Sequence, residues 1–185
     1  GLGVGRSGLT FSLLGRKYGS PWIYAALEPG MEAFSRQPTV WQLRDDYHWD
    51  SITGKTRFLG IIGYGESENI AARVLNAAFQ QMDRPIRCLP LQPGDLNRFP
   101  KMLEKLGING LVVDPAWRGD LFELADSCDE FGTLGRRVDV LMEGQQGRRG
   151  VCTIFEAVNS AGQTVTGSAE WMGRGSVTVV GHSPM

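Results

Sequence analysis

The stretch "GIIGYGESENIAARVLNAAF", residues Gly60–Phe79, decides the fold of this chain. It opens with a short apolar run, passes through a glycine-rich turn and continues with apolar residues at helical spacing. That order is typical of a strand followed by a helix in a βα unit. The turn could bind a phosphate, hold part of a substrate or only connect the two elements.

The same alternation recurs along the chain. Strands are predicted at 22–27, 57–63, 84–89, 110–114, 138–143, 150–158 and 176–180, where β-branched and aromatic residues are dense. Helices are predicted between the early strands, with apolar faces on Val40, Leu43 and Tyr47; on Ile70, Val74, Ala78 and Phe79; on Phe99, Leu103 and Leu106; and on Leu121, Leu124 and Ala125. The predicted fold class is α/β, a mostly parallel sheet with flanking helices.

The composition narrows the classes of function that this chain could have. The chain has 185 residues, 42% of them hydrophobic, and a formal net charge of -1. These values predict an ordinary globular protein and give no reason to expect a nucleic-acid or membrane partner. Cys88, Cys128 and Cys152 are not at metal-ligand spacing. No signal segment or membrane-length apolar run occurs, so a cytoplasmic, reducing setting is expected.

The glycine turn does not fit a dinucleotide site. Gly63 and Gly65 match the first two glycines of G-x-G-x-x-G, but the third position is Glu68. Glu66 adds a second carboxylate, and both would repel a pyrophosphate. The two acids suit the positive end of a helix without any ligand.

From residue 60 to about 154, the chain resembles the N-terminal substrate-binding domain of shikimate dehydrogenases. "LNAAF", residues 75–79, keeps the Asn and Phe of the family's His-Asn-x-x-Phe helix. "GLVVDPAWR", residues 110–118, stands where the family has Gly-x-Asn-Val-Thr-x-Pro-His-Lys. The resemblance implies an α/β substrate domain and a ligand such as shikimate.

The departures from the family fall where chemistry would occur. Two loop serines become Asn69 and Ala71, and the catalytic lysine becomes Arg118. Arginine keeps the charge but does not release a proton near neutral pH. The aspartate that partners the lysine falls on Ile154, which cannot relay a proton. The resemblance therefore implies Asn69 and Arg118 as substrate contacts and no catalytic residue.

Residues 1–47 resemble the C-terminal end of type I 3-dehydroquinate dehydratase. "GSPWIYAAL", residues 19–27, and "RQPTVWQLRDDY", residues 36–47, carry this resemblance. Gln37 matches the glutamine of that family's substrate loop, whereas Ala33 and Ser12 replace its serine and its arginine. A partial βα-barrel segment is therefore expected at the N-terminus, without the lysine of the Schiff base.

These resemblances predict three parts: a barrel-tail segment at 1–50, a substrate-binding domain at 56–158 and the start of a nicotinamide-binding domain at 159–185. Residues 45–56 are the expected linker. The last part rests on "GRGSVTVVGHSPM", residues 173–185, which resembles that domain's first strand and turn. The chain thus looks like the middle of a bifunctional dehydratase/dehydrogenase, cut at both ends. No cofactor is expected in this segment, and NADP only if a downstream domain exists.

Two functions remain open at this point. The chain is read as part of a shikimate-pathway protein, degenerate here, that at most binds a small polyhydroxylated carboxylate; the alternative is a non-catalytic binding or assembly module. A homodimer is left open. For Arg118 the competing interpretation is a surface ion pair with Asp120 or Glu123. Asp114-Pro115 is equally a turn with a helix cap, and Cys152 is expected in the core.

Overall fold

The structure is a computed structural model that describes residues 8–35, 37–63, 68–91, 98–154, 156, 157 and 160. Within helix α2 the side chains of residues 68 and 69 are not described. The predicted strand at 176–180 lies outside the described residues. The chain forms two compact units, Gly1–Cys152 and Thr153–Met185, and the fold below is that of the first.

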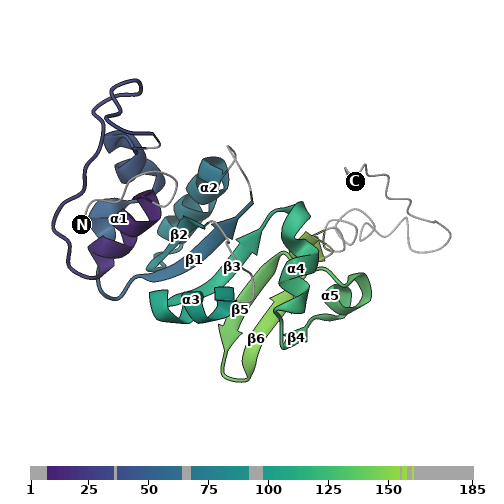
Figure 1. Cartoon of the computed structure of the whole chain (residues 1–185). Helices are drawn as coiled ribbons and strands as arrows, with labels where there is room; N and C mark the ends of the chain where they lie inside the picture. Colours follow the sequence, from purple (N-terminus) through teal and green to yellow (C-terminus); the bar gives the residue numbers. More distant parts are fainter. Residues whose placement is uncertain are drawn as a thin grey trace. The chain divides into compact units, whose positions relative to one another are not determined.

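A six-stranded sheet forms the centre of this unit (Figure 1). Its strands, in the order in which they pair, are β2 (Ile86–Leu91), β1 (Arg57–Ile62), β3 (Ile108–Val113), β5 (Val140–Gly144), β6 (Gly147–Val151) and β4 (Ser127–Cys128). The β1–β2, β1–β3 and β4–β6 pairs are parallel, and only β5 runs antiparallel to its neighbours. The predicted fold class, α/β with a mostly parallel sheet, is confirmed.

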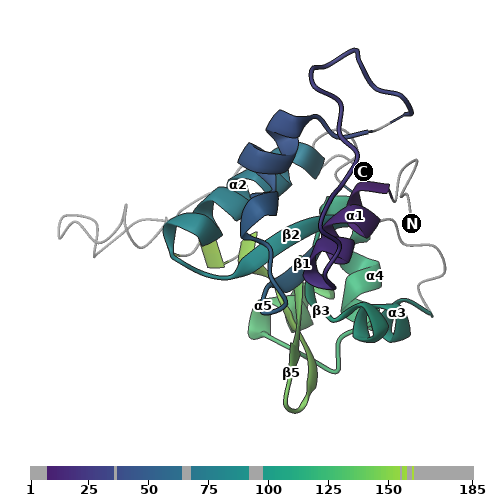
Figure 2. The same ribbon diagram turned by 90° about the vertical axis from the view of Figure 1, so that its left-hand side faces the viewer.

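Helices cover both faces of the sheet. They are α1 (Gly8–Lys17), the π-helix η1 (Gln42–Asp46), the 3-10 helix η2 (Trp49–Ser51), α2 (Glu68–Gln81), α3 (Phe99–Leu106), the 3-10 helix η5 (Pro115–Trp117), α4 (Arg118–Glu123) and α5 (Glu130–Gly135). Figures 1 and 2 show α1 and α3 on one face and α2 with η1 on the other. Successive βα crossovers on opposite faces follow from the right-handed rule, since β2 and β3 flank β1 on opposite sides.

Buried apolar residues explain β1 and α3. Phe58, Ile61 and Ile62 on β1 are at most 1% exposed, as expected for a central strand covered on both faces. Helix α3 begins with a proline in its first turn and ends at Gly107, whose φ of 63° suits glycine at a helix C-terminus. The predicted helix with Phe99 and Leu103 in the core is confirmed.

The predicted buried face of α2 was partly wrong. Ile70 and Val74 are 57% and 61% exposed, whereas Ala72 and Asn76 are fully buried. The close packing of α2 against β2 admits a small residue and an amide that finds partners there, and Phe79 is only partly buried. Apolarity alone therefore pointed to the wrong side of the helix.

The predicted buried strand at 22–27 was also wrong. Only Ala26 pairs, through an isolated parallel bridge to Thr39. Trp22, Tyr24 and Leu27 are 59%, 52% and 76% exposed, and the two rings pack edge to face with centroids 5.2 Å apart. The segment is extended, but within the described residues no second strand covers it.

Two other boundaries differ from the predictions. The second hairpin strand is Gly147–Val151 rather than 150–158, because the turn takes only Gln145 and Gln146. The expected linker is packed: Tyr47, Ile52 and Thr56 are each at most 2% exposed. The proposed division of the chain at about residue 50 stays a prediction.

The polar groups on the free side of β2 are satisfied by side chains. Asn76 accepts a hydrogen bond from the Cys88 N–H at 2.7 Å, and Thr10 on α1 donates to the Pro90 carbonyl. The Arg87 guanidinium donates to the Ile86 carbonyl at 2.7 Å. Buried backbone groups require such partners, so α1 and α2 are both tied to this strand.

The Asn76 amide also reaches the N-terminal segment. Its Nδ2 donates to the Asp46 carbonyl at 2.8 Å, while its Oδ1 accepts from Cys88 N–H. One fully buried side chain therefore joins η1, α2 and β2.

We predict that Asn76→Ala lowers the free energy of unfolding by roughly 2–4 kcal/mol, because it leaves a buried donor and a buried acceptor unpaired. Urea denaturation followed by circular dichroism measures this change. Gln81→Ala, at the exposed end of the same helix, is the control and should change stability by less than about 0.5 kcal/mol. Equal effects of the two substitutions would contradict the role of Asn76.

Charged groups lie close together where η1 and η2 meet β2. Arg87 is 4% exposed, and among the described residues its hydrogen bonds reach only neutral acceptors, including Ser51 Oγ at 2.6 Å and Gln80 Oε1 at 2.8 Å. Burial lowers the pKa of His48, and the positive charge of Arg87 lowers it further. Burial raises the pKa of Asp46, an effect that Arg73 opposes.

The lowered pKa of His48 predicts a pH-dependent stability. The unfolded chain binds a proton near the usual pKa of 6.5 more readily than the folded chain does, so stability is lost as pH falls below about 6.5. His48→Asn should remove this loss, since asparagine tolerates the left-handed backbone at φ 48°. Urea denaturation between pH 7.5 and 5.5 measures this pH dependence of the free energy of unfolding. His182→Asn, which removes the other histidine, is the control. Parallel curves for wild type and His48→Asn would contradict the prediction.

Candidate functional site

The carboxyl ends of β1 and β3 form the candidate site. The strands are parallel neighbours that end together, with Ile62 paired to Val113. The pairing continues one step further, because the Asp114 N–H donates to the Ile62 carbonyl at 3.0 Å. In open α/β sheets ligands bind at this kind of edge, outside the carboxyl ends of the strands.

Asp114 turns the chain from β3 into the helices that follow. Its Oδ1 accepts a hydrogen bond from the Ala116 N–H at 2.9 Å, and Pro115 occupies the first position of η5. This is the predicted turn with a helix cap. The Asp114 carboxylate therefore holds the backbone that carries Trp117 and Arg118.

Trp117 packs against the glycine turn that follows β1. A Cβ atom on Gly63 would lie 2.7 Å from both Trp117 Nε1 and Asp114 Cγ, so only glycine fits. Gly63 also has a φ of 93°, a conformation that side chains disfavour. Sequence reasoning missed this contact, although a glycine directly after a strand was the available signal.

The same contact bears on the nucleotide question. The first glycine of a dinucleotide turn lets a pyrophosphate approach the backbone. At Gly63 the space that a Cβ atom would take holds an indole ring and a carboxyl group. Residues 64–67 of the turn lie outside the described residues, so the expectation that this segment holds no nucleotide stays a prediction.

Arg118 begins α4 at this edge and is half-buried. Its Nε is buried and makes no hydrogen bond. The alternative interpretation, an ion pair with Asp120 or Glu123, was wrong: Glu123 instead pairs with Arg136 at 2.9 Å. Within the described part of the chain, the Arg118 guanidinium has no acidic partner.

The other two candidate residues lie elsewhere or are only partly described. Asn69 is the second residue of α2, which follows β1, so its backbone belongs to the same edge of the sheet as Arg118. Gln37 lies in the loop before η1, and its Oε1 accepts a hydrogen bond from the Ala33 N–H at 2.7 Å. Gln37 thus closes its own loop. Whether any of the three contacts a substrate stays a prediction.

The arginine at this edge can bind an anion. An arginine fork binds a carboxylate through two parallel hydrogen bonds and keeps its charge. Asp129, near the end of β6, is already engaged as an acceptor from Gly132 N–H at 2.8 Å and from Cys152 N–H at 3.1 Å. The described residues contain no group of three or more His, Cys, Asp or Glu side chains that could hold a metal ion. Cys152 is 2% exposed, as predicted for a core residue.

Comparison with known proteins shows what this domain is similar to. Over 108 residues, 57% of the chain, it is 32% identical to the shikimate dehydrogenase (NADP(+)) of Synechocystis sp., of which it covers 37%. Among solved structures it is similar to shikimate 5-dehydrogenase from Listeria monocytogenes in complex with shikimate and NAD (TM-score 0.51, 18% identity, 60% of this chain and 40% of that one). It is also similar to 5-ketofructose reductase of Gluconobacter sp. strain CHM43 (TM-score 0.54, 14% identity, 60% and 41%).

The chain therefore contains a shikimate dehydrogenase-like α/β domain. No protein-family model matches it, and it spans little more than a third of the length of the Synechocystis relative. No helix of the described residues has the length and apolarity to cross a membrane.

We predict that Gly63→Ala destabilises the fold by more than the roughly 1 kcal/mol of its strained backbone alone, because the new methyl group would displace Trp117. In a Trp117→Ala background the contact with the ring is absent, so the same substitution should cost less: the backbone strain and the remaining contact with Asp114. Urea denaturation of the four proteins gives the coupling between the two positions. Additive effects would show that Trp117 does not pack on Gly63.

Proposed function

We propose that this chain is the substrate-binding part of a shikimate-pathway protein and binds a shikimate-like acid at the carboxyl ends of β1 and β3. The ligand is a small polyhydroxylated carboxylate, held through its carboxylate by Arg118, with Asn69 as a second contact. The observation that carries this proposal is the half-buried Arg118, which has no acidic partner among the described residues. A guanidinium shielded from water favours an anionic partner.

We further propose that this segment does not turn over its ligand. Arg118 replaces the lysine expected from the family resemblance, and Ile154 replaces the aspartate. Neither replacement can exchange a proton with a substrate hydroxyl. No nucleotide is held in this segment; NADP would bind only to a domain beyond it. The filled space at Gly63 supports this part of the proposal.

The longer protein, in this proposal, is a 3-dehydroquinate dehydratase/shikimate dehydrogenase-like protein. The exposed rings of Trp22 and Tyr24 support a barrel-tail origin for the N-terminal segment, since barrel strands require a neighbour on each side. The parallel bridge between Ala26 and Thr39 is the type of pairing that a βα barrel contains. Gln37 would then act only beside the rest of such a barrel.

A second candidate is a binding or assembly module that kept the fold and lost the chemistry. The exposed apolar side chains between residues 11 and 41, among which the Trp22 and Tyr24 rings are in contact, favour it, because exposed apolar patches commonly mark interaction sites. A homodimer is one form of this proposal. A cytoplasmic setting is also proposed, and three free cysteines support it.

Calorimetric titration with shikimate and 3-dehydroquinate tests the first proposal, with cyclohexanol as the neutral control. Saturable binding of either acid should weaken roughly ten- to a hundredfold in Arg118→Ala, which is the worth of a charge-assisted contact. Arg84→Ala, an exposed arginine with no side-chain hydrogen bond among the described residues, is the matched control and should bind as wild type does.

The outcomes separate the two candidates. Binding that is equal in wild type and Arg118→Ala would overturn the assigned contact. No heat at millimolar acid, from a cooperatively unfolding sample, would overturn the binding proposal and favour the assembly module. Analytical ultracentrifugation of the same sample then reports whether the chain self-associates.

A further inference from the structure

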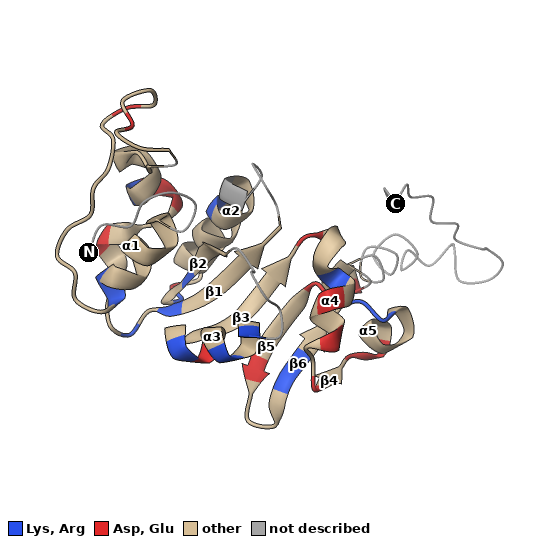
Figure 3. Cartoon of the chain, viewed as in Figure 1, with Lys and Arg blue, Asp and Glu red and all other residues tan. Residues whose placement is uncertain are grey.

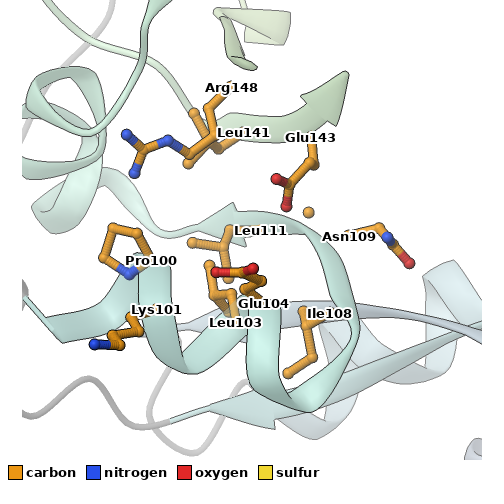
Figure 4. A pocket seen from close by; sticks show the side chains of 11 residues that line it. Pro100, Lys101, Leu103, Glu104, Ile108, Asn109, Leu111, Leu141, Glu143 and Arg148 are labelled. Carbon is orange, nitrogen blue, oxygen red and sulfur yellow. The ribbon is translucent and has the colours of Figure 1, made fainter. Parts of the chain in front are cut away.

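A hollow lies near the start of β3, at the opposite end of that strand from the candidate site with Arg118. It has a volume of about 410 Å³ and is bounded by the first half of β3, by α3 and by the β5–β6 hairpin (Figure 4). β3 begins here and ends at the candidate substrate site, so the two places are separated by the length of that strand.

The floor of this hollow is apolar and fixed. Leu103, Ile108, Leu111 and Leu141 line it, and each is at most 6% exposed. A volume of several hundred cubic ångströms above an apolar floor is at the small end of ligand pockets in proteins.

Charges around the rim are separated by sign. Figure 4 shows Glu104 of α3 and Glu143 of β5 pointing into the opening, with the charged ends of Lys101 and Arg148 turned to the other side. Both signs are present on α3 and on the hairpin as a whole (Figure 3), so the separation is local to the opening.

Arg148 is already neutralised. Asp126 accepts hydrogen bonds from the Arg148 backbone N–H at 2.7 Å and from its Nε at 3.2 Å. This pairing holds the pKa of Asp126 below its usual range. Among the described residues, by contrast, neither Glu104 nor Glu143 forms an ion pair. Lys101 is the other cation in the lining, so the opening presents two carboxylates against one ammonium group above an apolar floor.

We propose that this hollow binds a small organic cation: a primary ammonium group attached to a compact aromatic or branched aliphatic body. The ammonium lies between the Glu104 and Glu143 carboxylates, where it donates hydrogen bonds to both. The apolar body lies on the leucine and isoleucine floor. An anion of the same shape would meet the two carboxylates and is excluded by charge.

Phenethylamine is the probe that tests this site, because its ring and ammonium match the two halves of the hollow. NMR titration of isotopically labelled protein should show saturable shifts at Asn109, Glu143 and Arg148. Phenylacetate and 2-phenylethanol, which share the ring but carry the opposite charge or none, should bind at least several-fold more weakly.

Substitutions test whether Glu104 and Glu143 contact the ammonium group. Glu143→Gln and Glu104→Gln should each weaken phenethylamine binding by roughly two- to fivefold, the worth of a partly exposed ion pair. Glu28→Gln, which removes one exposed carboxylate elsewhere, should leave binding unchanged. Equal binding of phenylacetate, shifts confined to other elements, or no effect of either variant would overturn the proposal. Because Arg118 takes no part, the result is independent of the shikimate titration.

Discussion

The buried amide of Asn76 is the contact on which the arrangement of the first unit depends. It binds a backbone group of η1 on one side and a backbone group of β2 on the other. A shorter or apolar side chain would leave both groups unpaired in a water-free place. The asparagine retained from the His-Asn-x-x-Phe pattern is thus explained by structure: it fixes how the segment before the sheet packs against α2.

Sequence patterns correctly predicted the elements that are buried on both faces or that carry clear end signals. β1 is covered on both faces, so a plain apolar run was sufficient to identify it, and α3 carries its start and stop signals in Pro100 and Gly107. The patterns failed where burial depends on which other element packs against the segment. Ile70 and Val74 lie on the outside of α2, whereas Ala72 and Asn76 face the sheet. The run at Trp22 is apolar enough for a buried strand but lacks a second neighbour within the described residues.

The candidate site was predictable in outline only. Motif alignment located Arg118 shortly after a predicted strand, and strand pairing places the end of that strand beside the end of β1, which the glycine turn follows. The alignment gave no information about Trp117, which occupies the space above Gly63, or about the pairing of Glu123 with Arg136 that leaves Arg118 without an acid. Both depend on contacts between residues far apart in the chain. The hollow beside α3 has no sequence motif at all.

The polar groups along β2 have a consequence for assembly. An edge strand normally offers a row of N–H and C=O groups on which another chain can add a strand. In β2 the Cys88 N–H donates to the Asn76 side chain and is not free for another strand. Pro90 has no N–H, and its carbonyl accepts a hydrogen bond from the Thr10 hydroxyl. At the other edge β4 has only two residues. Both edges of the sheet are thus poorly suited to strand addition, so the backbone of this sheet offers little on which a second chain could pair.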